Sequence, residues 1–261
     1  MITAGIDVGS VTTKAVILSD NNVIGEHLVP TKADPNLAAQ TTLMEALKIA
    51  GIPSGKVDST ISTGYGRRAI DYGDKTVTEI SANARGSVFL GSPAGKVRTI
   101  IDLGGQDSKV IALDENGKIT RFLMNDKCSA GTGRFFEVMA NALGVSLDKM
   151  GEMSLLSKAP LKINSTCTVF AESEVVSLIA RRQKKEDIIA GLHESMAKKI
   201  STMAKEVGVR PVVFFDGGGA KNAGVKAALE KQLDVKIYVP EKPQFVVALG
   251  AALLARENVK K

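Results

Sequence analysis

Two short strings, 95 residues apart, carry the side chains in this sequence that are best suited to chemistry. Residues 5–18 recur as residues 100–113, and the constant offset pairs Asp7 with Asp102. Each copy runs from a β-branched stretch through an aspartate and a turn of glycines and small polar residues into a second apolar stretch, which predicts a β-hairpin. Glycine lets backbone N–H groups approach an anion closely. The duplicated turn therefore predicts a pair of phosphate-binding hairpins.

Both predicted turns also carry polar groups that suit a nucleotide and its magnesium ion. Asp7 and Asp102 are expected to hold Mg²⁺ through its bound waters, and Gln106 or Asp102 to orient the attacking water. The predicted phosphate contacts are Gly9, Ser10, Val11, Thr12, Thr13 and Lys14 in the first turn and Gly104, Gly105 and Asp107 in the second. A single copy would be explained most simply as a plain glycine hairpin. Two copies, facing each other across a cleft, favour phosphate binding.

A third glycine-rich segment follows a predicted buried strand over residues 211–215. The triple glycine is expected to let a flat ring or a phosphate lie against bare backbone, with a helix opening at Ala220 whose N-terminus favours negative charge. Neither a Rossmann fingerprint nor a Walker loop occurs where a strand and helix would require it. The predicted adenosine contacts are Gly217, Gly218, Gly219, Ala220 and Asn222.

The remaining pattern alternates helices with strands, which favours the α/β class. Two lobes are expected: residues 1–95 with the C-terminal helix 243–261, and residues 96–242. Helices are predicted over 36–50, 79–90, 131–143, 169–182, 185–207 and 245–256, and further strands over 58–62 and 235–239.

Taken in order, the two hairpins, the glycine segment and the small residues of 248–252 resemble the superfamily of actin, sugar kinases and heat-shock chaperone ATPases. The resemblance covers essentially the whole chain. It implies a two-lobed actin-like (ribonuclease H-like) ATPase fold that binds ATP and Mg²⁺, with the small-residue helix letting the lobes pack closely.

The sequence has only two cysteines, Cys128 and Cys167, and each lies shortly before a predicted helix. Free N–H groups and the positive end of the helix dipole favour a thiolate or an anionic cluster there. A lone cysteine is more often a small buried hydrophobe. A disulfide between the two is not expected in a reducing cytosol.

The strings around these cysteines resemble the ATP-dependent activators of 2-hydroxyacyl-CoA dehydratases and the related ATPase subunits of benzoyl-CoA reductases. The matching strings are residues 63–67, 78–81, 125–128, 130–134 and 167–174. The resemblance implies one [4Fe–4S] cluster at the twofold axis of a homodimer, held by Cys128 and Cys167 of both chains. A four-cysteine zinc site is the chemical alternative. Ala82 and Asn83 stand where family members often carry Cys-His, which puts in doubt the partner that is served.

The resemblance further implies that ATP hydrolysis drives single electrons from ferredoxin or flavodoxin to a partner iron–sulfur enzyme. That partner is expected to be a 2-hydroxyacyl-CoA dehydratase, with an aromatic-ring CoA reductase or a double-cubane cluster protein as alternatives. A small-molecule kinase and a non-catalytic nucleotide-dependent regulator are rival interpretations, because a fold alone does not fix function.

Composition narrows the classes of partner. The net charge is +6, but the basic stretch at residues 181–185 lacks the aromatic residues and motifs of a nucleic-acid site, so none is expected. The longest apolar run, residues 245–255, is too short for a bilayer, which needs about 20 residues. The N-terminus shows no signal-peptide pattern. A cytoplasmic location without membrane attachment is therefore expected.

Overall fold

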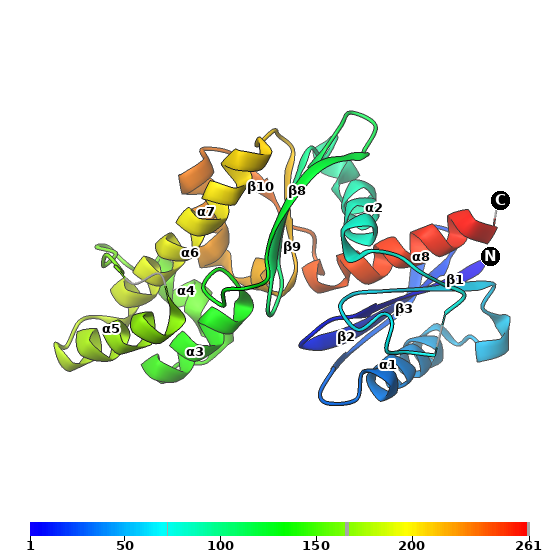
Figure 1. The fold of residues 1–261 in the computed structure, drawn as a ribbon, viewed down its shortest axis with the longest axis horizontal. Helices are drawn as coiled ribbons and strands as arrows, with labels where there is room; N and C mark the ends of the chain where they lie inside the picture. The colour runs from blue at the N-terminus through cyan, green and yellow to red at the C-terminus, as the bar shows by residue number, and fades with distance from the viewer. Residues whose placement is uncertain (72, 165–166, 260–261) are drawn as a thin grey trace. The chain divides into compact units, whose positions relative to one another are not determined.

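The chain folds into two compact units, each built on a five-stranded sheet (Figure 1). The computed structural model describes residues 1–71, 73–164 and 167–259. One unit comprises Met1–Val97, Leu113–Ile119 and Gln244–Lys261, and the other comprises Arg98–Ala112 and Thr120–Pro243. Strands and helices alternate in both, so the predicted α/β class is confirmed.

The first unit contains the first predicted hairpin at the centre of its sheet. The strand order is β3-β2-β1-β4-β5. β1 pairs antiparallel with β2, which places Asp7 opposite Lys14, and β4 lies parallel to β1 on its other side. The strands are β1 (Ile2–Val8), β2 (Thr12–Ser19), β3 (Asn22–Pro30), β4 (Ser59–Thr63) and β5 (Lys75–Thr76).

Small residues let the helices of the first unit pack closely on one another and on the sheet. A Cβ atom on Gly250 would overlap the carbonyl of Ala82, and one on Gly5 would overlap the carbonyl of Ala248. The run of small residues at 248–252 is thus required by helix and strand packing inside this unit. The helices are α1 (Pro35–Ala50), α2 (Glu79–Gly91) and α8 (Val246–Val259).

The second unit repeats the central part of this arrangement. Its strand order is β10-β9-β6-β7-β8. β6 and β7 form the second hairpin, with Asp102 opposite Lys109, and β9 lies parallel to β6. The strands are β6 (Thr99–Leu103), β7 (Ser108–Leu113), β8 (Ile119–Asn125), β9 (Val213–Asp216) and β10 (Ile237–Tyr238).

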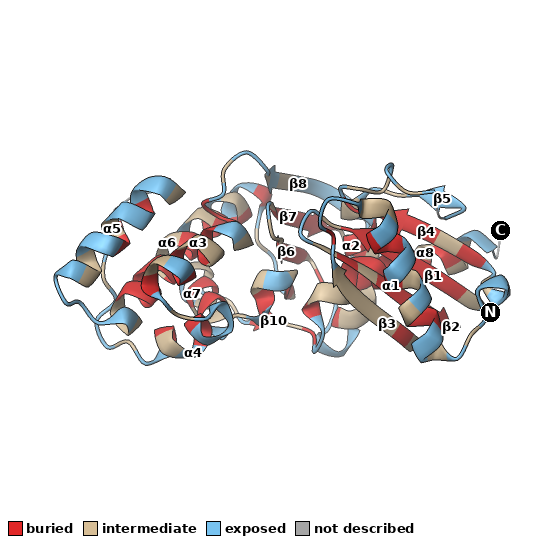
Figure 2. Ribbon diagram, turned by 90° about the horizontal axis from the view of Figure 1, so that it is seen from below, coloured by how far each residue is buried: buried red, intermediate tan, exposed pale blue. Residues whose placement is uncertain are grey.

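The long helix α6 (Lys185–Val207) lies at the centre of the helical part of the second unit. Buried residues recur along most of its length, whereas α5 (Thr168–Ala180) buries only Ala171 and Val175, and its other residues are half-buried or exposed (Figure 2). The other helices are α3 (Gly133–Leu143), α4 (Met150–Leu155) and α7 (Ala223–Leu233). None of the helices in the described ranges is both long and apolar enough to cross a membrane.

Two helix starts differ by more than one residue from the sequence-based expectation. The predicted helix start at Ala220 is wrong, because Gly218–Lys221 forms a 3₁₀ turn and α7 begins at Ala223. The Asn222 side chain caps α7 by accepting from the Val225 N–H at 3.1 Å. α3 begins at Gly133, two residues later than predicted.

Candidate functional site

In the first hairpin, buried polar groups hold the turn between β1 and β2 in place. The Gly9 N–H donates to the Thr12 carbonyl at 3.2 Å. The Thr13 hydroxyl lies 2.9 Å from the Thr31 hydroxyl, which in turn donates to the Gly9 carbonyl at 2.7 Å. Thr13 is therefore buried as a support of the turn, while Ser10 and Val11 are exposed at its tip.

Asp7 and Lys14 form an ion pair at the base of this hairpin. Lys14 Nζ lies 3.0 Å from Asp7 Oδ2, and both side chains are largely buried. The hairpin register explains the pair, because it places the two residues directly opposite each other. Lys14 thus compensates the buried carboxylate, and Asp7 Oδ1 has no hydrogen-bond partner among the described residues.

The second hairpin has the same pair with one more acid. Lys109 is 2% exposed, and its Nζ lies 3.3 Å from Asp102 Oδ2 and 2.8 Å from Asp107 Oδ1. Such a buried lysine is stable as a cation only because two carboxylates surround it. Gln106 is exposed at the tip of the turn.

Backbone hydrogen bonds join the second turn to the start of α3. The Gly133 N–H donates to the Gly104 carbonyl and the Arg134 N–H to the Gly105 carbonyl, both at 2.8 Å. These bonds satisfy two N–H groups that a helix start leaves without intrahelical partners. The turn predicted to bind phosphate is therefore attached to the helix that follows the Cys128 segment.

The duplication extends to a third element, which sequence comparison missed. Gly64 follows β4 with φ +89°, and Gly217 follows β9 with φ +79°. A Cβ atom on Gly64 would lie 2.5 Å from Asp7 Oδ1, and one on Gly217 would lie 2.5 Å from Asp102 Oδ1. Each hairpin aspartate therefore lies directly beneath a glycine whose backbone no other residue type would readily adopt.

The turns after these two glycines share their hydrogen bonds. The Arg67 N–H donates to the Gly64 carbonyl at 3.4 Å, and the Ala220 N–H to the Gly217 carbonyl at 3.3 Å. The segment predicted to hold adenosine thus has a backbone counterpart in the first unit. In the predicted adenosine segment itself, Gly218 is exposed, whereas the Ala220 side chain is buried.

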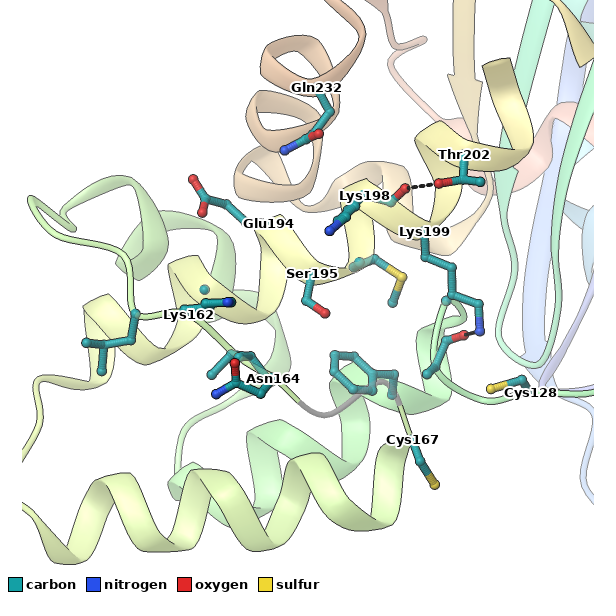
Figure 3. Close-up of a pocket in the computed structure, with 17 residues that line it drawn as sticks. Cys128, Lys162, Asn164, Cys167, Glu194, Ser195, Lys198, Lys199, Thr202 and Gln232 are labelled. Carbon is teal, nitrogen blue, oxygen red and sulfur yellow. Dashed lines mark hydrogen bonds between the residues drawn. The ribbon is translucent and has the colours of Figure 1, made fainter. Parts of the chain in front are cut away.

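Both cysteines are free and line one cavity in the second unit (Figure 3). Cys167 is exposed and occupies the N-cap of α5, and Cys128 is half-buried. The Asn125 amide donates to the Cys128 carbonyl at 2.9 Å, and Lys199 Nζ donates to the Ala130 carbonyl. The Cys128 segment is therefore fixed by side chains from β8 and α6, although it lies in a loop.

Asn222, at the end of the predicted adenosine loop, rests on a buried histidine. Asn222 Nδ2 lies 3.2 Å from His193 Nε2, and since an amide NH₂ only donates, Nε2 accepts and Nδ1 carries the proton. The ring packs edge-on against Phe136 at 5.1 Å between centroids. Burial lowers the pKa of His193 to about 3, so the ring is neutral near pH 7.

Stability is expected to fall in mild acid because of His193. The unfolded chain binds a proton at this histidine below about pH 6.5, while the folded chain does so only near pH 3. The free energy of unfolding should therefore drop by about 1.4 kcal/mol per pH unit below pH 6.5, or about 2 kcal/mol by pH 5. Urea unfolding of the parent and of His193→Gln between pH 5 and 7.5 measures this slope.

The other histidine, His27 on β3, provides the matched control. His27→Gln keeps His193 and should keep its contribution to the acid slope, whereas His193→Gln should lose it. A His193→Gln variant as acid-sensitive as the parent would contradict the assignment.

The paired hairpins, the glycine turn and the two sheets define an ATPase of the actin-like class. The chain belongs to the BadF/BadG/BcrA/BcrD ATPase family, whose sequence profile matches residues 4–255. A glucokinase of the ROK family from Streptomyces griseus shares the fold alone, with a TM-score of 0.60 at 14% identity over 98% of this chain and all of that one.

Close relatives are dehydratase activators. The 2-hydroxyisocaproyl-CoA dehydratase activator of Clostridioides difficile is 41% identical over 100% of this chain and 97% of its own length. The (R)-2-hydroxyglutaryl-CoA dehydratase activating ATPase of Acidaminococcus fermentans is 43% identical over 99% of this chain and 98% of its own. A solved structure of the 2-hydroxyisocaproyl-CoA dehydratase activator from Clostridium difficile with bound ADPNP superposes with a TM-score of 0.94 at 41% identity, covering 100% of this chain and 96% of that one.

Proposed function

We propose that this chain hydrolyses ATP as a homodimer and delivers low-potential electrons, one at a time, to an iron–sulfur 2-hydroxyacyl-CoA dehydratase. The observation that carries the proposal is the pair of free cysteines in a chain that matches dehydratase activators over its whole length. Ferredoxin or flavodoxin would be the donor. An aromatic-ring CoA reductase or a double-cubane cluster protein is the alternative acceptor.

ATP would be held by the two hairpin turns and the loop at residues 217–222. The exposed tips offer backbone N–H groups and, at Ser10, a hydroxyl to the phosphates. Asp7 and Asp102 would bind waters of Mg²⁺, and the unpartnered Asp7 Oδ1 fits this role because a buried carboxylate oxygen requires a donor. Gln106 or Asp102 would orient the attacking water.

Cys128 and Cys167 would hold the iron–sulfur cluster together with the same two residues of a second copy. When bound, such a cluster supplies one-electron transfer at low potential, and it takes four thiolates. Two cysteines per chain fit a site shared by two chains. Val169 and Phe170, next to Cys167, are 67% and 68% exposed, which supports self-association at this end of α5.

The second hairpin would couple the nucleotide to the cysteine segment. Its Gly104 and Gly105 carbonyls accept from the first N–H groups of α3, so a shift of the turn on phosphate binding would move that helix start. Residues 129–132 then connect α3 directly to Cys128. Movement of the α3 start would therefore shift Cys128 and change the surroundings of its thiolate during each cycle of ATP hydrolysis.

Purification without oxygen tests the proposal. We expect a brown homodimer with about four iron and four sulfide per two chains, and a paramagnetic signal after one-electron reduction. Metal analysis, light scattering and electron paramagnetic resonance measure these quantities. A colourless protein would overturn the cluster, and zinc in place of iron would favour the structural-metal alternative.

A further inference from the structure

The cavity beside the two cysteines has walls fixed by hydrogen bonds. It measures about 760 Å³, which is within the roughly 300–1,000 Å³ typical of small-molecule sites. The Leu161 N–H donates to the Asp187 carbonyl at 3.0 Å, and the Asn164 N–H donates to Glu174 Oε1 at 3.1 Å. Residues 161–164 are therefore bonded to both α6 and α5.

This cavity carries positive charge that the protein does not neutralise. Lys162 and Lys198 line it, and their side chains extend alongside the open space in Figure 3. Neither ammonium group has a carboxylate within ion-pair distance among the described residues. Glu194 also lines the cavity, but its Oε1 already accepts from Lys231 at 2.8 Å. The local field thus favours an anion.

The inner surface beneath these lysines is apolar. Phe135, Ile163 and Met196 contribute to the lining and are 3%, 9% and 2% exposed. The Ser195 hydroxyl, from the turn of α6 that also bears Lys198, adds a hydrogen-bonding group. Pockets of this kind bind ligands whose apolar body fills the base while a polar group fixes the orientation.

We propose that this cavity binds an amphipathic anion. An aliphatic chain would pack on Phe135 and Met196, and a carboxylate or phosphate head would lie between Lys162 and Lys198. Because Cys128 and Cys167 line the same cavity, the ligand would alter the surroundings of both thiolates. The site lies within the second unit and requires neither iron nor nucleotide.

Calorimetric titration of the anaerobically purified homodimer tests this site. A non-hydrolysable ATP analogue is present at saturation, so that no probe binds at the phosphate turns. Octanoate or octyl phosphate should bind, and the tighter of the two identifies the head group. Acetate, which lacks the chain, and octanamide, which lacks the charge, should each bind at least about tenfold more weakly than octanoate.

Lysine variants then locate the head group. The double variant Lys162→Gln/Lys198→Gln should bind octanoate at least about tenfold more weakly, since each charged hydrogen bond contributes. Lys205→Gln, on α6 outside the cavity, should leave the affinity unchanged. An unaltered rate of ATP hydrolysis shows that both variants fold. Equal octanoate affinity in parent and double variant would overturn the proposal.

Methyl resonances locate the aliphatic chain. With ¹³C-methyl methionine, octanoate should shift the Met196 signal and leave that of Met44, exposed on α1, in place. A Met196 signal that does not shift at saturating octanoate would also overturn the proposal. The titration works equally well on an iron-free protein, so its outcome is independent of the cluster.

Discussion

Under the proposed function, replacing Cys167 with serine is expected to leave the protein without iron and to lower activation of a dehydratase at least about a hundredfold. A serine hydroxyl stays protonated where a ligating cysteine is a thiolate, and a [4Fe–4S] cluster takes four thiolates, which the proposal draws from two chains. Cys167 is exposed at the N-cap of α5, where serine is itself a favourable residue. The free energy of unfolding should therefore change by less than about 0.5 kcal/mol.

ATP hydrolysis separates this loss from general damage. The predicted phosphate turns contain no cysteine, so Cys167→Ser should hydrolyse ATP at nearly the parent rate while failing to activate the partner. Ser173→Ala, on an exposed position of the same helix, should keep both iron and activation. Iron retained in Cys167→Ser at the parent level would show that this residue is not a ligand.

The hairpins were predictable because their signals are local. A β-branched strand, a glycine turn and a second apolar strand determine both the fold of 5–18 and its repeat at 100–113. The helix over Lys185–Val207 was also predicted with its observed bounds, since its apolar spacing is continuous. Short or glycine-containing helix starts, as at Ala223, depend on side-chain caps that compete with 3₁₀ turns.

The glycine turn of the first unit could not be recognised from the sequence as a counterpart of the predicted adenosine loop. Its offset from Gly64 to Gly217 is 153 residues, against 95 for the hairpins, and few residue types are shared around it. The equivalence appears in the backbone angles, in the hydrogen bonds of the turns and in the aspartate beneath each glycine. The ion pairs of Lys14 and Lys109 likewise follow from strand register, which the sequence pattern does not show directly.

The cavity beside the cysteines was equally hidden from the sequence. Its lysines, Lys162 and Lys198, are 36 residues apart and belong to a loop and a helix whose contact is tertiary. A lone lysine in a sequence is most simply explained as a solvated side chain. Only the tertiary structure, which brings the two lysines together over an apolar surface, indicates a binding site for an anion.

Replacing Asp102 with asparagine is expected to lower the rate of ATP hydrolysis by about a hundredfold or more, because a preorganised charge at the proposed reacting centre would be lost. The fold should survive, since asparagine keeps the shape of the side chain and Lys109 retains Asp107 at 2.8 Å. The variant should also need more Mg²⁺ for half-maximal rate, because a neutral amide holds magnesium-bound water less well than a carboxylate.

The Mg²⁺ dependence distinguishes a direct role from a purely structural one. A variant that merely loosened the hairpin would lose rate at every Mg²⁺ concentration, whereas loss of an ion-positioning carboxylate moves the midpoint of the titration. Asp148→Asn, an exposed acid of the same unit, should change neither the rate nor the midpoint. Parent-like hydrolysis by Asp102→Asn would remove Asp102 from the proposed catalytic machinery.

The first unit repeats the same aspartate, lysine and glycine. The corresponding Asp7→Asn variant therefore tests whether both aspartates position the Mg²⁺ ion or only Asp102 does.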